Sequence, residues 1–293
     1  MRAREPDAEG YVERDGVKLH YEVFGDGAPT LLLMPTWTIV HARFWKAQVP
    51  YLARHFRVVT YDGPGNGRSD RPLDPAPYQA EAQGRSALAV LDATGTERAV
   101  PVSLSMAVQW ALWLMAYRPE RVLGSVFIGP SLDIAPGYTG REEPFDEPYV
   151  STEGWARYNR YYWRDHYRDF LEFFFSQCFV EPHSTKPIED TVGWGLETTP
   201  GVLLAENDAE WVDEATLRDW CAASCCPVLV VHGTKDRISP LRRAELLAEA
   251  TGGALVVLEG AGHIPMARDP VRVNLLIREF VGLAGPPAAG RRP

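Results

Sequence analysis

Two serines lie two residues apart in the stretch PVSLSMAVQW, residues 101–110, between a β-branched run and an apolar run with helical character. A serine becomes a nucleophile when a sharp strand-to-helix turn presents its oxygen and a base lies beside it. Such a turn requires small residues two positions before and two positions after the nucleophile. Ser105 has Ser103 and Ala107 at those positions, whereas Ser103 has Pro101 and Ser105. We therefore predict Ser105 to be the nucleophile. On this stretch alone, a serine that merely caps a helix is the alternative.

Two further loops could supply the partners of this serine. Asp236 lies in HGTKDRISP after the apolar run PVLVV, and His263 lies in GAGHIPMARDP after the run ALVVLEG. Ser105, Asp236 and His263 thus follow three separate strand ends in the order Ser, Asp, His, which is a known chain order of hydrolase triads. His232 is a competing base, but it is closer to its strand and no helix positions it. Asp236 has an alternative interpretation as a turn aspartate ahead of Pro240.

Acyl transfer also needs two hydrogen-bond donors for the oxyanion that forms during attack. One is expected to be the backbone N–H of Met106, the residue after the nucleophile. The other is expected in the loop MPTWTIVHARFW, which follows the apolar run TLLLM. Pro35 has no N–H, so Thr36 is the first candidate and Trp37 the second. An ordinary strand-to-helix turn is the alternative for this loop.

The elements that position these loops alternate between short β-runs and helical stretches up to residue 129, and the alternation resumes at residue 227. Continuous apolar strands in such an alternation predict a mostly parallel sheet covered on both faces. In such a sheet the chemistry lies at the carboxyl ends of the strands. Residues 132–214 contain no β-run, are rich in aromatic residues, and hold 18 acidic against 6 basic residues. We expect a helical, aromatic, acidic insertion there.

Three segments together resemble the α/β-hydrolase fold: YDGPGNGRSDRP (61–72), PVLVVHGTKDRISP (227–240) and LEGAGHIPMARDP (258–270). The resemblance covers nearly the whole chain. It implies a mostly parallel eight-stranded sheet covered by helices, with a helical cap inserted after strand 6. The expected domains are a hydrolase core of residues 1–131 and 215–284, a cap of residues 132–214, and a flexible tail of residues 285–293.

The same resemblance gives each site residue a role. Ser105 is the expected nucleophile, His263 the general base and then general acid, and Asp236 the orienting carboxylate. Asp133, just after the sixth strand, is the alternative acid in this fold. The chain departs from most relatives at Met34-Pro35, where they have His-Gly, and at Ala107, where they have glycine.

Aromatic residues of the cap are expected to cover the substrate pocket, although aromatic side chains more commonly just pack helices together. We expect the substrate to be a carboxylic ester, lactone or thioester of a bulky apolar or aromatic small molecule. A C–C bond hydrolase or an acyltransferase on the same triad is the alternative, and a non-catalytic ligand-binding protein is a third. The predicted pocket residues are Trp37, His41, Trp155, Tyr158, Tyr162, Phe174 and Ile264.

Composition excludes several other functions. The net charge of −9, from 39 acidic and 30 basic residues, argues against a nucleic-acid partner. The N-terminus has no apolar signal segment, and the longest apolar runs, about ten residues, are too short for a bilayer, so we expect a cytoplasmic protein without a membrane partner. The four cysteines form no disulfide framework or zinc pattern. No cofactor or metal is expected, and the sequence does not indicate the oligomeric state.

Overall fold

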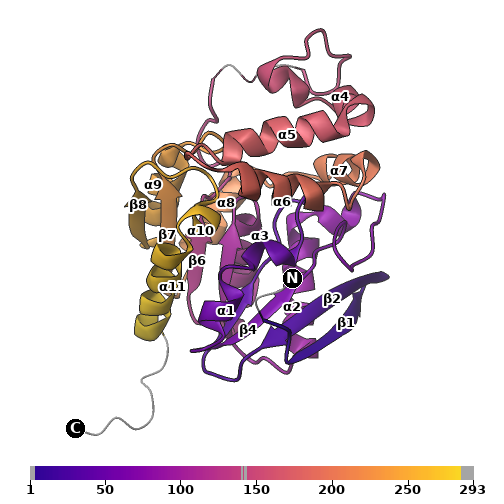
Figure 1. Ribbon diagram of the computed structural model, residues 1–293. Coiled ribbons are helices and arrows are strands. Elements are labelled where there is room, and N and C mark those ends of the chain that lie inside the picture. Colours follow the sequence, from indigo (N-terminus) through magenta and orange to yellow (C-terminus); the bar gives the residue numbers. More distant parts are fainter. Residues whose placement is uncertain (1–3, 140, 142–143, 285–293) are drawn as a thin grey trace, which may run out of the picture.

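One eight-stranded sheet organises the computed structural model, which describes residues 4–139, 141 and 144–284 (Figure 1). The strand order is β1-β2-β4-β3-β5-β6-β7-β8. β1 and β2 form an antiparallel hairpin, β2 pairs antiparallel with β4, and the remaining pairs are parallel. The predicted fold class is confirmed. The strands are β1 (Ala8–Arg14), β2 (Val17–Phe24), β3 (Thr30–Leu33), β4 (Arg57–Tyr61), β5 (Ala99–Leu104), β6 (Ser125–Ile128), β7 (Val228–Gly233) and β8 (Ala254–Leu258).

Helices cover both faces of this sheet, which explains why its central strands are continuous apolar runs. One face of the sheet, which includes Leu32 of β3, packs against helices α2, α3, α8 and α9. The other face, which includes Leu31 and Leu33, packs against α1 and α11. Alternate residues of a strand point to opposite faces, so one short strand contributes to both layers. The helices are α1 (Val49–Leu52), α2 (Ala80–Ala93), α3 (Ala107–Tyr117), α8 (Glu214–Ala222), α9 (Leu241–Thr251), α10 (Pro265–Arg268) and α11 (Pro270–Ala284); the 3₁₀ helices are η1 (Ala42–Trp45), η2 (Ala76–Tyr78), η3 (Pro119–Arg121) and η4 (Gly154–Arg157).

Between β6 and β7 the described residues form helices and no strand. Four of these helices, which we call the cap, lie across the upper end of the molecule in Figure 1. Their starts are encoded locally: the Asn159 side chain accepts the N–H groups of Tyr161 and Tyr162, and Thr199 caps the helix that begins with Pro200. The cap helices are α4 (Arg160–Asp165), α5 (Tyr167–Cys178), α6 (Thr185–Gly195) and α7 (Pro200–Asn207).

The exact division into domains stays a prediction. Helix α8, which begins at Glu214, packs against α3 and α9 and therefore belongs to a layer of the sheet rather than to the cap. The expected flexible tail, residues 285–293, lies outside the described residues. No helix in the described part of the chain is long and apolar enough to cross a membrane.

Candidate active site

Ser105 occupies the turn between β5 and α3 in a left-handed backbone conformation, with φ of 59°. A non-glycine residue rarely adopts this conformation, and such strain occurs at functional turns. The turn is tied to the next strand, because the Ser105 N–H donates to the carbonyl of Ile128 at 2.9 Å. Ala107 is fully buried, as expected where strand and helix approach closely. Ser103 is also fully buried, whereas Ser105 lines two cavities.

His263 and Asp236 form a direct hydrogen bond, with 2.7 Å between His263 Nδ1 and Asp236 Oδ2. Both side chains are buried. The other oxygen, Asp236 Oδ1, accepts the backbone N–H groups of Ile238 at 2.7 Å and Ser239 at 2.9 Å. Burial disfavours the carboxylate, but the charge and hydrogen bond of His263 hold the pKa of Asp236 below its usual value. Asp236 is therefore an ionised acceptor that fixes the imidazole.

Backbone contacts place His263 against the cap and against β6. The His263 N–H donates to the carbonyl of Cys178 at the end of α5 (3.0 Å), and the neighbouring Gly262 N–H donates to Glu181 Oε1 (2.8 Å). Gly129, with φ of 49°, lies against the histidine: a Cβ there would be 2.9 Å from the His263 carbonyl oxygen. The position of the imidazole thus depends on a glycine that sequence reasoning did not identify.

Replacing Gly129 with alanine is expected to destabilise the protein by about 1–3 kcal/mol, because the left-handed conformation strains alanine and the new Cβ meets a backbone oxygen. Thermal unfolding measures this loss. Gly252→Ala is the matched control, since Gly252 has φ of 63° but no atom near its virtual Cβ. An equal decrease in melting temperature for the two variants would contradict the close contact with His263.

Neither of the two competing residues, Asp133 and His232, lines the cavities beside Ser105. The side chain of Asp133, the predicted alternative acid, is 61% exposed, and its carboxylate pairs with Arg243 at 2.8 Å. His232 is fully buried, and its Nε2 lies 3.1 Å from the carbonyl oxygen of Ser239 and 3.5 Å from Asp236 Oδ2. Burial lowers the pKa of this histidine. In the described residues Asp236 is the carboxylate that contacts His263.

The loop after β3 passes beside the nucleophile. Thr36 is buried, and its Oγ1 donates to the carbonyl of Leu104 at 2.9 Å, which ties the loop to the end of β5. Thr36 and Trp37 line a cavity with Ser105, and Met106 lines the adjacent one. Within the described residues, the backbone N–H groups of Thr36, Trp37 and Met106 make no hydrogen bond and remain available as donors.

Ser105 stands between two cavities that share Trp37 and Phe174 as walls. The first, about 160 Å³, also contains His263 and is bounded mainly by apolar side chains, including Ile264. The second, about 250 Å³, is bounded by aromatic side chains and, besides Ser105, by four polar residues. These polar residues are Ser131, Arg141, Glu206 and Asn207. Of the predicted pocket residues, the structure brings Trp37, Trp155, Tyr158, Phe174 and Ile264 to these cavities.

Two predicted pocket residues are not at these cavities. His41 turns toward acidic groups behind the loop, with its Nε2 3.4 Å from Glu197 Oε2 and its ring edge against Trp194. Tyr162 uses its hydroxyl to donate to Asp169 at 2.5 Å and lies 4.8 Å, ring centre to ring centre, from His166. In both cases the side chain has a polar partner outside the two cavities, Glu197 for His41 and Asp169 for Tyr162.

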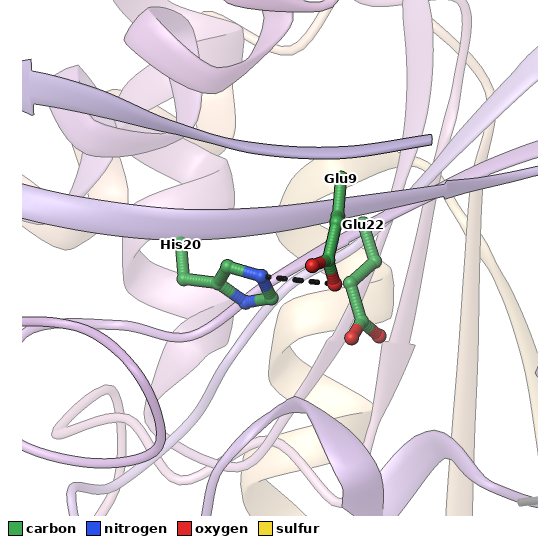
Figure 2. A group of neighbouring side chains, drawn as sticks. All are labelled: Glu9, His20 and Glu22. Atoms are coloured by element: carbon green, nitrogen blue, oxygen red, sulfur yellow. Dashed lines mark ion pairs between the residues drawn. The ribbon is translucent and has the colours of Figure 1, made fainter. Parts of the chain in front are cut away.

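A group of three side chains on the β1–β2 hairpin has the geometry of a small cation site. Its ligand atoms lie within 4.8 Å of one another and belong to Glu9 on β1 and to His20 and Glu22 on β2. Figure 2 shows the imidazole of His20 directed at Glu9, 3.6 Å from Nε2 to Oε2. However, the Arg68 guanidinium already contacts both oxygens of Glu9, at 2.7 and 3.3 Å. We therefore assign this group to structural ion pairing.

A sequence model of the family described as "alpha/beta hydrolase fold" matches residues 29–270, which include Ser105, Asp236 and His263. The chain belongs to this family. This hydrolase is similar to a pimeloyl-[acyl-carrier protein] methyl ester esterase of Aeromonas hydrophila, with 28% identity over 89% of the chain and 98% of the relative. It is equally similar to a 2-hydroxymuconate semialdehyde hydrolase of a Pseudomonas species, with 28% identity over 92% of each chain. Among solved structures it resembles the enol-lactonase of Burkholderia xenovorans, with a TM-score of 0.76 and 22% identity over 93% of this chain and 99% of the other.

Proposed function

We propose that this hydrolase cleaves a carboxylic ester, lactone or thioester of a small, bulky and largely apolar molecule through an acyl-enzyme on Ser105. The observation that carries the proposal is the strained Ser105 turn, which opens into the same cavity as His263, the hydrogen-bond partner of Asp236. A serine that only completes a turn in the core would need neither the strained backbone of Ser105 nor the buried, hydrogen-bonded His263 and Asp236.

The proposed reaction follows from this geometry. Donation from His263 Nδ1 to Asp236 fixes the tautomer and leaves Nε2 to accept a proton. His263 removes the Ser105 hydroxyl proton as the oxygen attacks the carbonyl carbon, and the N–H groups of Met106 and of Thr36 or Trp37 stabilise the oxyanion. The imidazolium then protonates the leaving group, and a water molecule, activated by the same histidine, clears the acyl-enzyme.

The two cavities beside Ser105 support a substrate of two unlike halves. The apolar first cavity suits a hydrocarbon or aromatic portion, and the second suits a portion that carries hydrogen-bonding groups. The cap supplies walls to both cavities through Phe174, so we propose that it acts as a lid over the scissile bond. The methyl ester esterase named above supports ester hydrolysis.

Hydrolysis of a C–C bond on the same triad is the second candidate. It is favoured by the equal identity to a relative named as a semialdehyde hydrolase. An acyltransferase would use the same residues with an acceptor other than water, and a ligand-binding protein would need no activated serine.

Fluorophosphonate labelling followed by intact-mass and peptide mass spectrometry tests the proposal. We expect one adduct per chain, on Ser105 and not on Ser103, because only Ser105 reaches the cavities. A panel of p-nitrophenyl esters, lactones, thioesters and β-diketones then separates the two candidates. A folded protein that takes no label would refute the nucleophile and favour ligand binding, and turnover restricted to diketones would favour C–C cleavage.

A further inference from the structure

The loop that carries the predicted oxyanion donors is held by a buried acid of the cap. Glu206 lies on α7 and is 3% exposed. Its Oε2 accepts the backbone N–H of Thr38 at 2.9 Å. Thr38 directly follows Trp37 and is two residues beyond Thr36. A single carboxyl group of the cap is therefore bonded to the backbone of the oxyanion loop.

Thr38 is enclosed from the other side as well. The amide of Asn66, in the loop after β4, donates to the Thr38 carbonyl at 2.7 Å and to the carbonyl of Trp194 on α6 at 3.2 Å. Gly65 lies so close that a Cβ there would be 2.6 Å from Thr38 Cγ2 and 2.9 Å from Val202 of α7. Thr38 is thus packed between the sheet and two cap helices, and the Glu206 bond is its polar contact with α7.

The surroundings of Glu206 contain no cation in contact with the carboxyl among the described residues. Its Oε1 is buried and has no hydrogen-bond partner there. Burial raises the pKa of Glu206 to about 8, against the lowering effect of the Thr38 hydrogen bond. The carboxyl is therefore largely protonated at neutral pH. Three tyrosines interact electrostatically with the Glu206 carboxyl, and burial together with Glu206 raises their pKa values: Tyr78, Tyr158 and Tyr167. The charged group nearby is Arg141, which lines the second cavity together with Glu206.

We propose that Glu206 is a positioning residue whose carboxyl, bonded to the backbone of Thr38, fixes the oxyanion loop beneath the cap. The inference rests on the proposed function, because the loop matters for rate only if Ser105 forms an oxyanion. Glu206 acts through Thr38 and the loop, and it does not contact the reacting atoms.

Ionisation of Glu206 opposes this role in two ways. A carboxylate accepts the Thr38 N–H more strongly than a neutral carboxyl does, but a buried carboxylate without a cation also favours conformations that hydrate it, and these loosen α7 over the loop. A negative charge beside the loop also disfavours the negative charge that develops on the substrate oxygen. We therefore expect the rate of reaction at Ser105 to fall as the pH rises through about 8.

The stability of the folded protein is expected to fall with rising pH, as the reaction rate does. The pKa of Glu206 is higher in the folded chain than its ordinary value of 4.5, so the folded state binds the extra proton. The contribution of the protonated Glu206 carboxyl to the free energy of unfolding is complete below about pH 4.5, and it is lost as the pH rises through about 8. The variant Glu206→Gln has no such proton and should gain melting temperature relative to the wild type as the pH is raised.

The test compares the wild type with Glu206→Gln and Glu206→Ala between pH 6 and 10. Glutamine mimics the neutral acid, because its carbonyl oxygen can accept the Thr38 N–H. Glu210→Gln is the matched control, an exposed glutamate just beyond the same helix. Two rates are measured, fluorophosphonate labelling and hydrolysis of p-nitrophenyl butyrate, because the phosphonyl oxygen and the ester oxyanion use the same donors. Melting temperatures are recorded in parallel.

We expect the two rates of Glu206→Gln to show no alkaline decline between pH 6 and 10. Glu206→Ala should lower kcat and the labelling rate about tenfold or more with little change in KM, since oxyanion donors act in the transition state. Unchanged rates in a folded Glu206→Ala, or an alkaline decline that persists in Glu206→Gln, would overturn the positioning role while leaving the proposed function intact. A folded wild type that neither labels nor hydrolyses the ester would overturn both.

Discussion

Replacing Ser105 with alanine is expected to lower kcat/KM by about 10⁴-fold or more and to abolish fluorophosphonate labelling. The physical reason is that Ser105 supplies the only hydroxyl of this turn that reaches the cavities beside His263. Residual activity would come from binding and from the oxyanion donors alone. The measurement is steady-state kinetics on the ester that the substrate panel identifies, with intact-mass labelling on the same samples.

Ser103→Ala is the control for this variant, because Ser103 lies two residues before Ser105, on β5, and is fully buried. Its hydroxyl has no hydrogen-bond partner in the described residues, so its removal leaves no donor or acceptor unpaired. We expect normal labelling and a melting temperature close to that of the wild type. Loss of labelling in Ser103→Ala with retention in Ser105→Ala would reverse the assignment of the nucleophile.

The strand-to-helix turn and the acid and histidine loops could be predicted because short local patterns determine them. Ser103 and Ala107 are small where backbones approach, and Asp236 and His263 follow apolar strands. Parallel strands bring their carboxyl ends to one edge, so the sheet alone was enough to predict that these loops meet. The roles of the three residues remain predictions until the serine is labelled.

Side-chain directions within the cap and the loops could not be predicted, because they depend on partners distant in the sequence. His41 was expected in the pocket, but Glu197, 156 positions away, lies beside its imidazole instead. Glu206 is one of many acidic residues in the cap segment, and nothing in its neighbourhood along the chain marks it as buried. Its burial and its contact with Thr38, 168 residues earlier, distinguish it from a solvated glutamate.

Asp236→Asn is expected to lower kcat by roughly 10⁴-fold at neutral pH while preserving the fold. The direction of the amide follows from the hydrogen bonds around it. Oδ1 must still accept the N–H groups of Ile238 and Ser239, so the new NH₂ group takes the place of Oδ2 beside His263. An NH₂ group donates, and it would force the Nδ1 atom of the imidazole to become the acceptor.

The proton of the imidazole then resides on Nε2, the atom that must accept the Ser105 proton, and the base is lost. Asp133→Asn is the matched control, since that carboxylate pairs with Arg243 at the surface and its loss is expected to cost about 0–1 kcal/mol without an effect on kcat. Measurement of kcat for both variants separates the two acids. A large decrease in Asp133→Asn with normal turnover in Asp236→Asn would assign the orienting role to the acid after β6, and the cap and histidine loop would have to rearrange in solution to bring it to His263.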